Sequence, residues 1–213
     1  MSSAQTLDHP SGLWETNNSA AVSILIGGTT ILQPRYVYST EIFLARRFLT
    51  GGVDLTLRSQ MIKELLVQAS ARWGDAIFYS ADPYQGRSRD ASAALTFQPW
   101  DDLALELTAR YSDFTRTSNS ETIYEISIGR SKLTYQLNRY LFFRGTLEYN
   151  TYRRRLLTDL LVSFTYIPGT VFHAGYGSLY ERSRWERDSY VPDSRFLETQ
   201  RGVFVKASYL WRI

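Results

Sequence analysis

The side chains of this chain that could do covalent chemistry are few. The 213 residues contain no cysteine and two histidines, His9 and His173. The absence of cysteine excludes disulfides, metal–thiolate sites and a thiol nucleophile. His9 lies in an irregular N-terminal stretch, which leaves His173 as the one histidine within a regular pattern.

A histidine needs a neighbouring carboxylate to act as a general base in a relay. Asp159 is the nearest candidate if residues 156–167 and 170–182 pair across a turn at Pro168-Gly169. That pairing places His173 opposite about Phe164, well below Asp159. We therefore predict a structural His173, no catalytic residue, no metal site and no cofactor.

Charged side chains form the second set with chemical potential, because they recur at alternate positions opposite apolar residues. The charged residues expected to face a common water-filled lumen are Asp54, Arg58, Arg72, Asp90, Glu106, Arg110, Glu125, Arg144, Glu148, Asp159, Lys206 and Arg212. Opposed charges along a passage could order ions and a solute. Alternatively, they pair with one another and fill the lumen, which we favour because small barrels are filled by side chains.

The elements that must position these residues are β-strands. In residues 103–111, Leu103, Leu105 and Leu107 alternate with polar residues, and the same period of two recurs from about residue 50 to the end. Segments 64–80, 101–116 and 139–153 exceed the usual five to six residues of a strand. No apolar run reaches the roughly 18 residues of a membrane-spanning helix. We predict an all-β, antiparallel up-and-down transmembrane β-barrel. A soluble β-sandwich or lipocalin-like barrel is the alternative, since a sheet with one wet face also alternates.

Aromatic residues gather near the predicted strand ends, as in the interfacial girdles of membrane barrels. Those assigned to the interfaces are Trp73, Trp100, Tyr140, Tyr149, Tyr166, Tyr176 and Trp211.

Counting back from the C-terminus gives about ten strands, with twelve as an alternative. They lie near 199–213, 170–182, 156–167, 139–153, 121–137, 101–116, 87–99, 64–80, 48–60 and within 18–28. Residues 29–41 are expected to form an outer loop, 42–60 one long strand bent at Gly51-Gly52, and Gly129-Arg130 a bulge. This divides the chain into an irregular segment, 1–17, and a barrel, 18–213. Tight turns near 99–102, 137–140 and 167–170 would face the periplasm, together with the N-terminus.

The charge balance restricts the partners. The net charge is +3 and the basic residues are scattered, which argues against nucleic acid as a partner. The run Arg153-Arg154-Arg155 should lie at the outer rim, where it could hold lipopolysaccharide phosphates or stay a solvated loop. Outer-membrane lipids and the barrel-assembly machinery, reached through the C-terminal strand, are the expected partners.

Five segments carry a resemblance to a known family. They are 13–19 (LWETNNS), 95–103 (LTFQPWDDL), 133–144 (LTYQLNRYLFFR), 166–170 (YIPGT) and 205–212 (VKASYLWR). In this order they resemble the C-terminal barrel of outer-membrane proteins that carry an N-terminal carbohydrate-binding family 9-like domain. The resemblance implies a location in the bacterial outer membrane and a missing upstream region. The N-terminus also lacks the features of a signal peptide, so we expect the chain to be the C-terminal part of a larger protein.

These patterns predict porin-like passage or binding of a small solute, with a carbohydrate link implied by the resemblance. The alternative is a structural membrane anchor with a plugged lumen for a periplasmic domain. An outer-membrane hydrolase is disfavoured because no nucleophile–base pair is visible, so we predict that the chain is not an enzyme.

Overall fold

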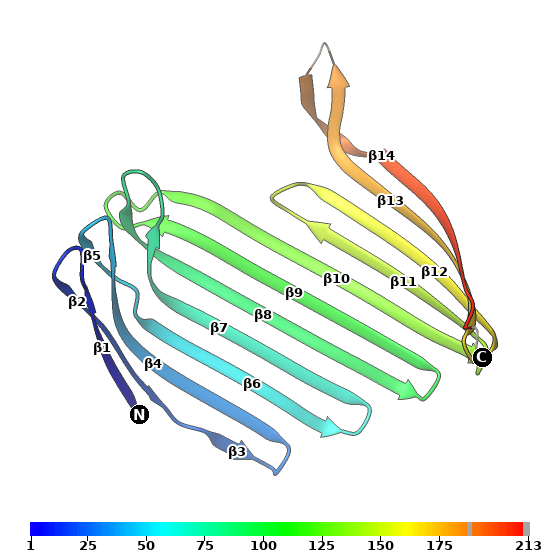
Figure 1. The fold of residues 1–213 in the computed structure, drawn as a ribbon, viewed down its shortest axis with the longest axis horizontal. Coiled ribbons are helices and arrows are strands. Elements are labelled where there is room, and N and C mark those ends of the chain that lie inside the picture. The colour runs from blue at the N-terminus through cyan, green and yellow to red at the C-terminus, as the bar shows by residue number, and fades with distance from the viewer. Residues whose placement is uncertain (187–188, 211–213) are drawn as a thin grey trace. The chain divides into compact units, whose positions relative to one another are not determined.

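The computed structural model describes residues 1–186 and 189–210, and every regular element within them is a β-strand (Figure 1). The strands are β1 (Ser2–Asp8), β2 (Leu13–Ala21), β3 (Ile24–Ile26), β4 (Thr30–Phe43), β5 (Arg46–Leu49), β6 (Gly52–Ile62), β7 (Leu65–Phe78), β8 (Tyr84–Trp100), β9 (Leu103–Arg116), β10 (Thr122–Asn138), β11 (Leu141–Asn150), β12 (Arg155–Ile167), β13 (Thr170–Glu186) and β14 (Ser189–Ser208). Among these residues there is no helix long and apolar enough to cross a membrane.

The strands pair in chain order, which confirms the prediction of an all-β, antiparallel up-and-down fold. The path runs β1-β2-β4-β6-β7-β8-β9-β10-β11-β12-β13-β14, while β3 and β5 pair with β4 beside it. Two residues each separate β8 from β9, β10 from β11 and β12 from β13, at the three predicted tight turns. Gly169 adopts a φ of 93° in the last of these, a backbone conformation that favours glycine.

The N-terminal region differs from the prediction. Residues 1–17 are not irregular, because β1 and most of β2 lie there and pair from Ser2–Ser19 to Asp8–Leu13. Residues 29–41 are not a loop but most of β4, and 42–60 contains the end of β4, then β5 and β6. Among the described residues the main path therefore has twelve strands, the alternative count, rather than about ten. Pro34 lies within β4 where the pairing passes from β2 to β3, so its missing N–H breaks no continuous ladder.

The expected bulge at Gly129-Arg130 is also wrong. β10 pairs with β11 without interruption from Ile128 to Gln136, and the register shifts only between Gln136 and Asn138. The apolar residues near the start of β10 therefore lie on the face of Arg130 and Lys132. Tyr124 packs there on Phe114, with ring centroids 5.9 Å apart.

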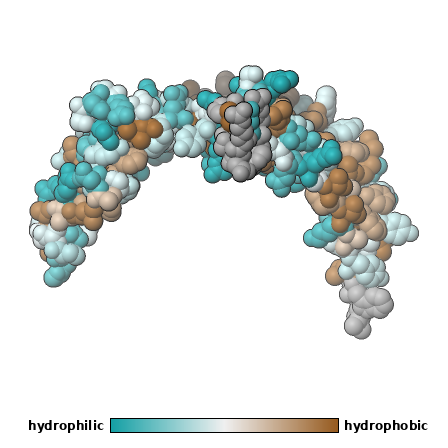
Figure 2. Space-filling model, turned by 90° about the horizontal axis from the view of Figure 1, so that it is seen from above, coloured by the Kyte–Doolittle hydropathy of each residue, from teal (hydrophilic) through white to brown (hydrophobic). Residues whose placement is uncertain are grey.

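The chain divides into two compact units, residues 1–93 with 110–126, and residues 94–109 with 127–213. Within the described residues only four hydrophobic side chains are buried, Val37, Phe48, Ile77 and Phe114, and all four belong to the first unit. Hydrophobic residues instead reach the surface, as the brown atoms in Figure 2 show. Each unit is thus a sheet without a second layer that covers it.

Candidate functional site

The register gives each unit one polar and one apolar face. The polar face carries cross-strand ion pairs. In the first unit Arg72 Nη1 lies 3.0 Å from Asp54 Oδ1. In the second, Lys132 Nζ lies 2.6 Å from Glu106 Oε1, and Arg144 Nη2 lies 3.7 Å from Asp159 Oδ1.

The structure brings most of the predicted lumen residues onto this polar face. Asp90 Oδ1 accepts a hydrogen bond from Ser112 Oγ at 2.6 Å, and Glu148 lies 4.0 Å from Arg130. Arg58, Arg110 and Lys206 have no ion pair in the part of the chain that is described. On the neighbouring strands, Arg58 is paired with Gln68 and Lys206 with His173. Arg212 lies outside the described residues. The alternation alone did not single out Arg35, Arg130 and Lys132, which complete the ion pairs.

Glu125 is on the opposite face from its predicted one. The continuous register along β10 places Glu125 on the same face as Ser131 and on the other face from Lys132. Its charge acts on Arg89 and Tyr111, which belong to the apolar face described below. The expected bulge, which does not occur, caused this error.

His173 lies opposite Ser163 and Lys206, and Phe164 faces Phe172 instead, one position away from the expected pairing. Asp159 lies opposite Gly177, four positions along β13 from His173. The Nδ1 atom of His173 is buried without a hydrogen-bond partner. None of the carboxylates that the structure describes is paired with this ring, so His173 lacks the geometry of a relay.

The predicted interfacial aromatics lie at different levels along the strands. Trp100, Tyr140 and Tyr166 lie at the tight-turn ends and are exposed. Trp73 and Tyr149 lie nearer the opposite strand ends, whereas Tyr176 lies in the middle part of β13. All three are on the same face as Val53, Leu147 and Val203, and we call this the apolar face. Trp211 lies outside the described residues.

The three consecutive arginines do not form one patch. Arg155 begins β12, and its Nε lies 2.5 Å from Glu181 Oε1. Arg153 donates its backbone N–H to Asn150, and Arg154 turns the chain with a φ of 50°. Arg153 and Arg154 thus lie in the turn, while Arg155 is held by a carboxylate.

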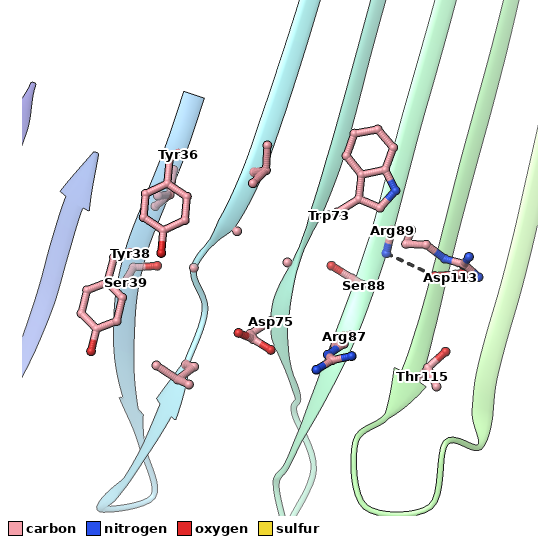
Figure 3. A pocket seen from close by; sticks show the side chains of 16 residues that line it. Tyr36, Tyr38, Ser39, Trp73, Asp75, Arg87, Ser88, Arg89, Asp113 and Thr115 are labelled. Carbon is pink, nitrogen blue, oxygen red and sulfur yellow. Dashed lines mark hydrogen bonds and ion pairs between the residues drawn. The ribbon is translucent and has the colours of Figure 1, made fainter. Parts of the chain in front are cut away.

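A hollow lined by aromatic and charged side chains opens on the apolar face of the first unit (Figure 3). Its volume is about 740 Å³, and β4, β6, β7, β8 and β9 all contribute to its wall. Tyr36, Val53 and Trp73 follow one another across three paired strands. Asp75 and Arg87 come from the neighbouring strands β7 and β8 (Figure 3). The hollow therefore combines aromatic rings with both signs of charge.

Three glycines lie in the wall of this hollow. Gly51 and Gly74 approach so closely that a Cβ on Gly74 would lie 2.6 Å from Gly51 O, and one on Gly51 would lie 2.6 Å from Val37 O. A Cβ on Gly52 would collide with the backbone of Trp73. Glycine permits such close backbone approach, so the strands lie close together at these three positions of the wall.

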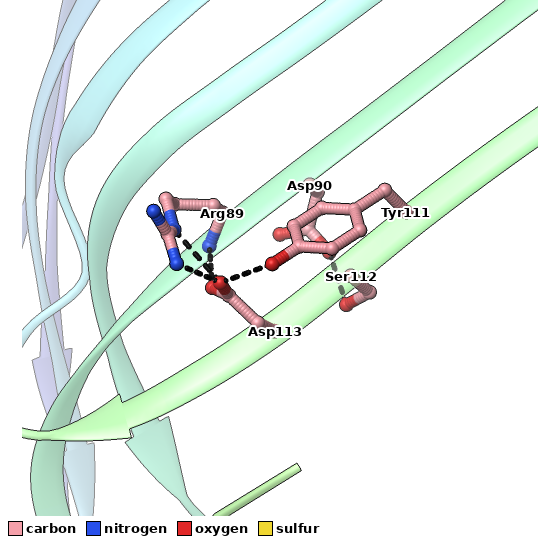
Figure 4. A network of polar contacts seen from close by, with 5 residues as sticks. All are labelled: Arg89, Asp90, Tyr111, Ser112 and Asp113. Atoms are coloured by element: carbon pink, nitrogen blue, oxygen red, sulfur yellow. Dashed lines mark hydrogen bonds and ion pairs between the residues drawn. The ribbon is translucent and has the colours of Figure 1, made fainter. Parts of the chain in front are cut away.

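A polar network borders the hollow on β8 and β9 (Figure 4). Asp113 is 2% exposed, and its carboxylate accepts hydrogen bonds from Tyr111 OH at 2.7 Å, Arg89 Nε at 2.8 Å and Arg89 N at 3.1 Å. Arg89 Nη2 is a further donor to it. The Arg89 side chain is itself 59% exposed, so Asp113 fixes a guanidinium whose outer edge stays open.

Sequence reasoning missed Arg87, Arg89, Tyr111 and Asp113 as a group. The sequence signal that could have revealed them is their position in the alternating pattern. They occupy odd-numbered positions of their strands, on the face that apolar residues such as Ala91, Leu95 and Leu105 otherwise fill. Charged residues within an apolar register are candidates for a site.

No protein-family model matches the sequence, and a comparison with curated proteins finds no match. Among solved structures, the chain is similar to the NanC porin in a rhombohedral crystal form, at 13% identity and a TM-score of 0.41, over 98% of this chain and 97% of that one. It is also similar to the Pseudomonas putida toluene transporter TodX, at 9% identity and a TM-score of 0.38, over 79% of this chain and 65% of that one. The Ralstonia pickettii toluene transporter TbuX gives 10% identity and a TM-score of 0.40, over 92% and 67%.

Proposed function

We propose that the chain is an outer-membrane β-barrel with its apolar face in lipid and its polar face toward a lumen. The observation that carries this proposal is the exposed apolar face of a one-layer sheet. Leu133, Leu160 and Val205 are 45%, 56% and 77% exposed, and none of the described elements of their unit covers them. A sheet in water must bury such a face against another layer, whereas lipid accepts it directly.

Strand length and orientation support the same proposal. β8 and β10 have 17 residues each, more than the roughly 9 to 11 that a tilted strand needs to cross the bilayer. The two-residue turns would face the periplasm, and the longer connections, such as 79–83 and 117–121, would face outward.

The proposed role is porin-like passage or binding of a small solute. Arg58, Arg110 and Lys206 support it, since these polar-face cations have no ion pair in the described part of the chain and could attract an anionic group. A carbohydrate link is a further part of this proposal and depends on the family resemblance, which stays a prediction.

A plugged anchor is the second candidate, and one observation favours it. Phe78, Tyr84, Phe114 and Tyr124 pack together on the polar face of the first unit, with Phe114 only 2% exposed. Such an aromatic cluster would narrow a lumen at its outer end.

We also propose that the chain is not an enzyme. Four ladder positions separate His173 from the position opposite Asp159, and His173 faces Lys206 rather than a carboxylate. A His173→Ala variant should therefore conduct and fold as the wild type does.

The first test is gel mobility of the detergent-refolded chain in SDS, boiled against unboiled. A closed barrel keeps its strand ladder and migrates faster until it is heated. Aggregation without a mobility shift would contradict the barrel.

Planar-bilayer recordings then separate the two roles. Steady conductance steps support passage, and a folded but silent chain supports the anchor. For a conducting barrel, Lys206→Glu should shift the reversal potential toward cations in a salt gradient. Arg201→Glu makes the same charge change on the apolar face and should leave that potential unchanged.

A further inference from the structure

We propose that the hollow of the first unit binds a membrane lipid through a phosphoethanolamine headgroup. This inference rests on the proposed function, because it requires the apolar face to lie in lipid. The argument depends on four features of the hollow: its opening, its free charges, its aromatic rings and its rigid border.

The opening of the hollow decides which molecules reach it. Tyr36, Val53 and Trp73 line it from the apolar face and are 59%, 45% and 49% exposed. A molecule that enters from lipid must be amphipathic. Its polar group must fit the hollow, and its acyl chains must lie along the apolar face next to it. A membrane lipid meets both requirements.

The charges of the hollow are balanced rather than basic. Arg87 and Arg89 are offset by Asp75 and Asp113. Arg89 and Asp113 neutralise each other, which leaves one free charge of each sign. No ion pair joins Arg87 to Asp75 within the described residues, and Figure 3 draws them on neighbouring strands without a bond between them. Complementarity therefore favours a headgroup with one negative and one positive group over a purely anionic one.

Each free charge has a suitable counterpart in phosphoethanolamine. The planar guanidinium of Arg87 matches two phosphate oxygens. The carboxylate of Asp75 can accept from a primary ammonium, and Trp73, two positions earlier on the same face of β7, offers a ring for cation–π attraction. Tyr36 and Tyr38 stand on the opposite side of the hollow, from β4 (Figure 3).

The border of the hollow is rigid, which lowers the entropic cost of binding. Asp113 holds Arg89 from three nitrogens and Tyr111 from its hydroxyl (Figure 4). Arg89 lies two residues from Arg87 on the same strand face, so its open edge can contact the same phosphate.

The experiment measures lipid binding to the refolded full chain in a neutral detergent by native mass spectrometry. The probes are phosphatidylethanolamine and phosphatidylglycerol with identical acyl chains. Arg87→Gln should weaken binding of both lipids about tenfold, because each loses a charge-assisted phosphate contact. Asp75→Asn should weaken phosphatidylethanolamine about tenfold and leave phosphatidylglycerol unchanged. Arg110→Gln, a polar-face control in the same unit, should change neither.

The proposal is overturned if Arg87→Gln and Asp75→Asn bind both lipids as the wild type does, or if Arg110→Gln loses as much. Displacement of the lipid by soluble phosphoethanolamine would overturn the lipid as the occupant and assign the hollow to a free small molecule. Gel mobility of each variant separates the two levels of failure. A chain that shows no heat-dependent shift contradicts both the proposed barrel and this lipid site. A folded barrel without lipid preference contradicts only the lipid site.

Discussion

Replacing Asp113 by Asn should destabilise the chain more than replacing any carboxylate of the polar face. Asp113 is 2% exposed and accepts from Arg89 and Tyr111. The amide would still accept at one oxygen, but its NH2 group would point at the guanidinium donors. Because the Arg89 side chain is 59% exposed, its charge can be solvated and is not stranded. The expected loss is therefore about 2 kcal/mol, that of charge-assisted hydrogen bonds, and less than the roughly 3–5 kcal/mol of a stranded buried charge.

The assay is urea unfolding of the refolded chain in micelles, followed by tryptophan fluorescence, with equal m-values required for the comparison. Asp54→Asn is the matched control, since Asp54 also pairs with an arginine, Arg72, but its side chain is 24% exposed. It should cost less than about 1 kcal/mol, as partly exposed ion pairs do. Equal losses for the two variants would refute the reasoning that burial of Asp113 sets the magnitude.

Three further perturbations test other parts of the fold. Ala45→Gly should stabilise the chain by about 1 kcal/mol in the same urea assay, because Ala45 has a φ of 57° in the turn between β4 and β5. Tyr79 lies beyond the end of β7, where partial burial and a hydrogen bond to Glu41 raise its pKa from 10 to about 12. The neutral phenol therefore adds stability that is present below pH 10 and is lost as the pH rises toward 12. Tyr79→Phe should remove this loss of stability at high pH. Gly86→Ala should cost about 2 kcal/mol, because the new methyl group would collide with the buried ring of Phe114.

A control for Gly86→Ala lies in β10. Gly129→Ala adds a methyl group where no atom lies within 4 Å, so it should not destabilise. If it costs as much as Gly86→Ala, strand glycines matter for a reason other than contact with Phe114. An unchanged pH profile in Tyr79→Phe would contradict the role of its hydrogen bond to Glu41.

The fold was predictable wherever side chains alternate without interruption. Leu103, Leu105 and Leu107 against Glu106 and Arg110 define a strand and its two faces, and the two-residue turn before it ends the previous strand. Alternation also placed Asp54 and Arg72 on the same face, and the antiparallel register of the structure then brings them into contact.

The prediction was wrong where local chemistry and pairing disagree. Residues 29–41 were expected to form an outer loop, yet one side of β4 changes partner at Pro34, so the strand tolerates the missing N–H. In β10 a bulge was expected at Gly129-Arg130, but the pairing with β11 runs through these residues without interruption. Tyr124 packs on Phe114 on the polar face, an arrangement between distant strands that alternation cannot reveal.

The same limit explains why the hollow was missed and why it is informative. Arg87, Arg89 and Asp113 hold positions in an apolar register, where an unpaired charge would be costly in lipid. Asp113 and Arg89 meet that cost by pairing with each other, but Arg87 and Asp75 do not pair. Two opposite charges left apart on a face proposed to lie in lipid need counterparts from outside the chain. A zwitterionic headgroup supplies a positive and a negative counterpart at once. Binding of such a lipid would therefore account for charged residues at positions where the alternating strand pattern predicts apolar ones.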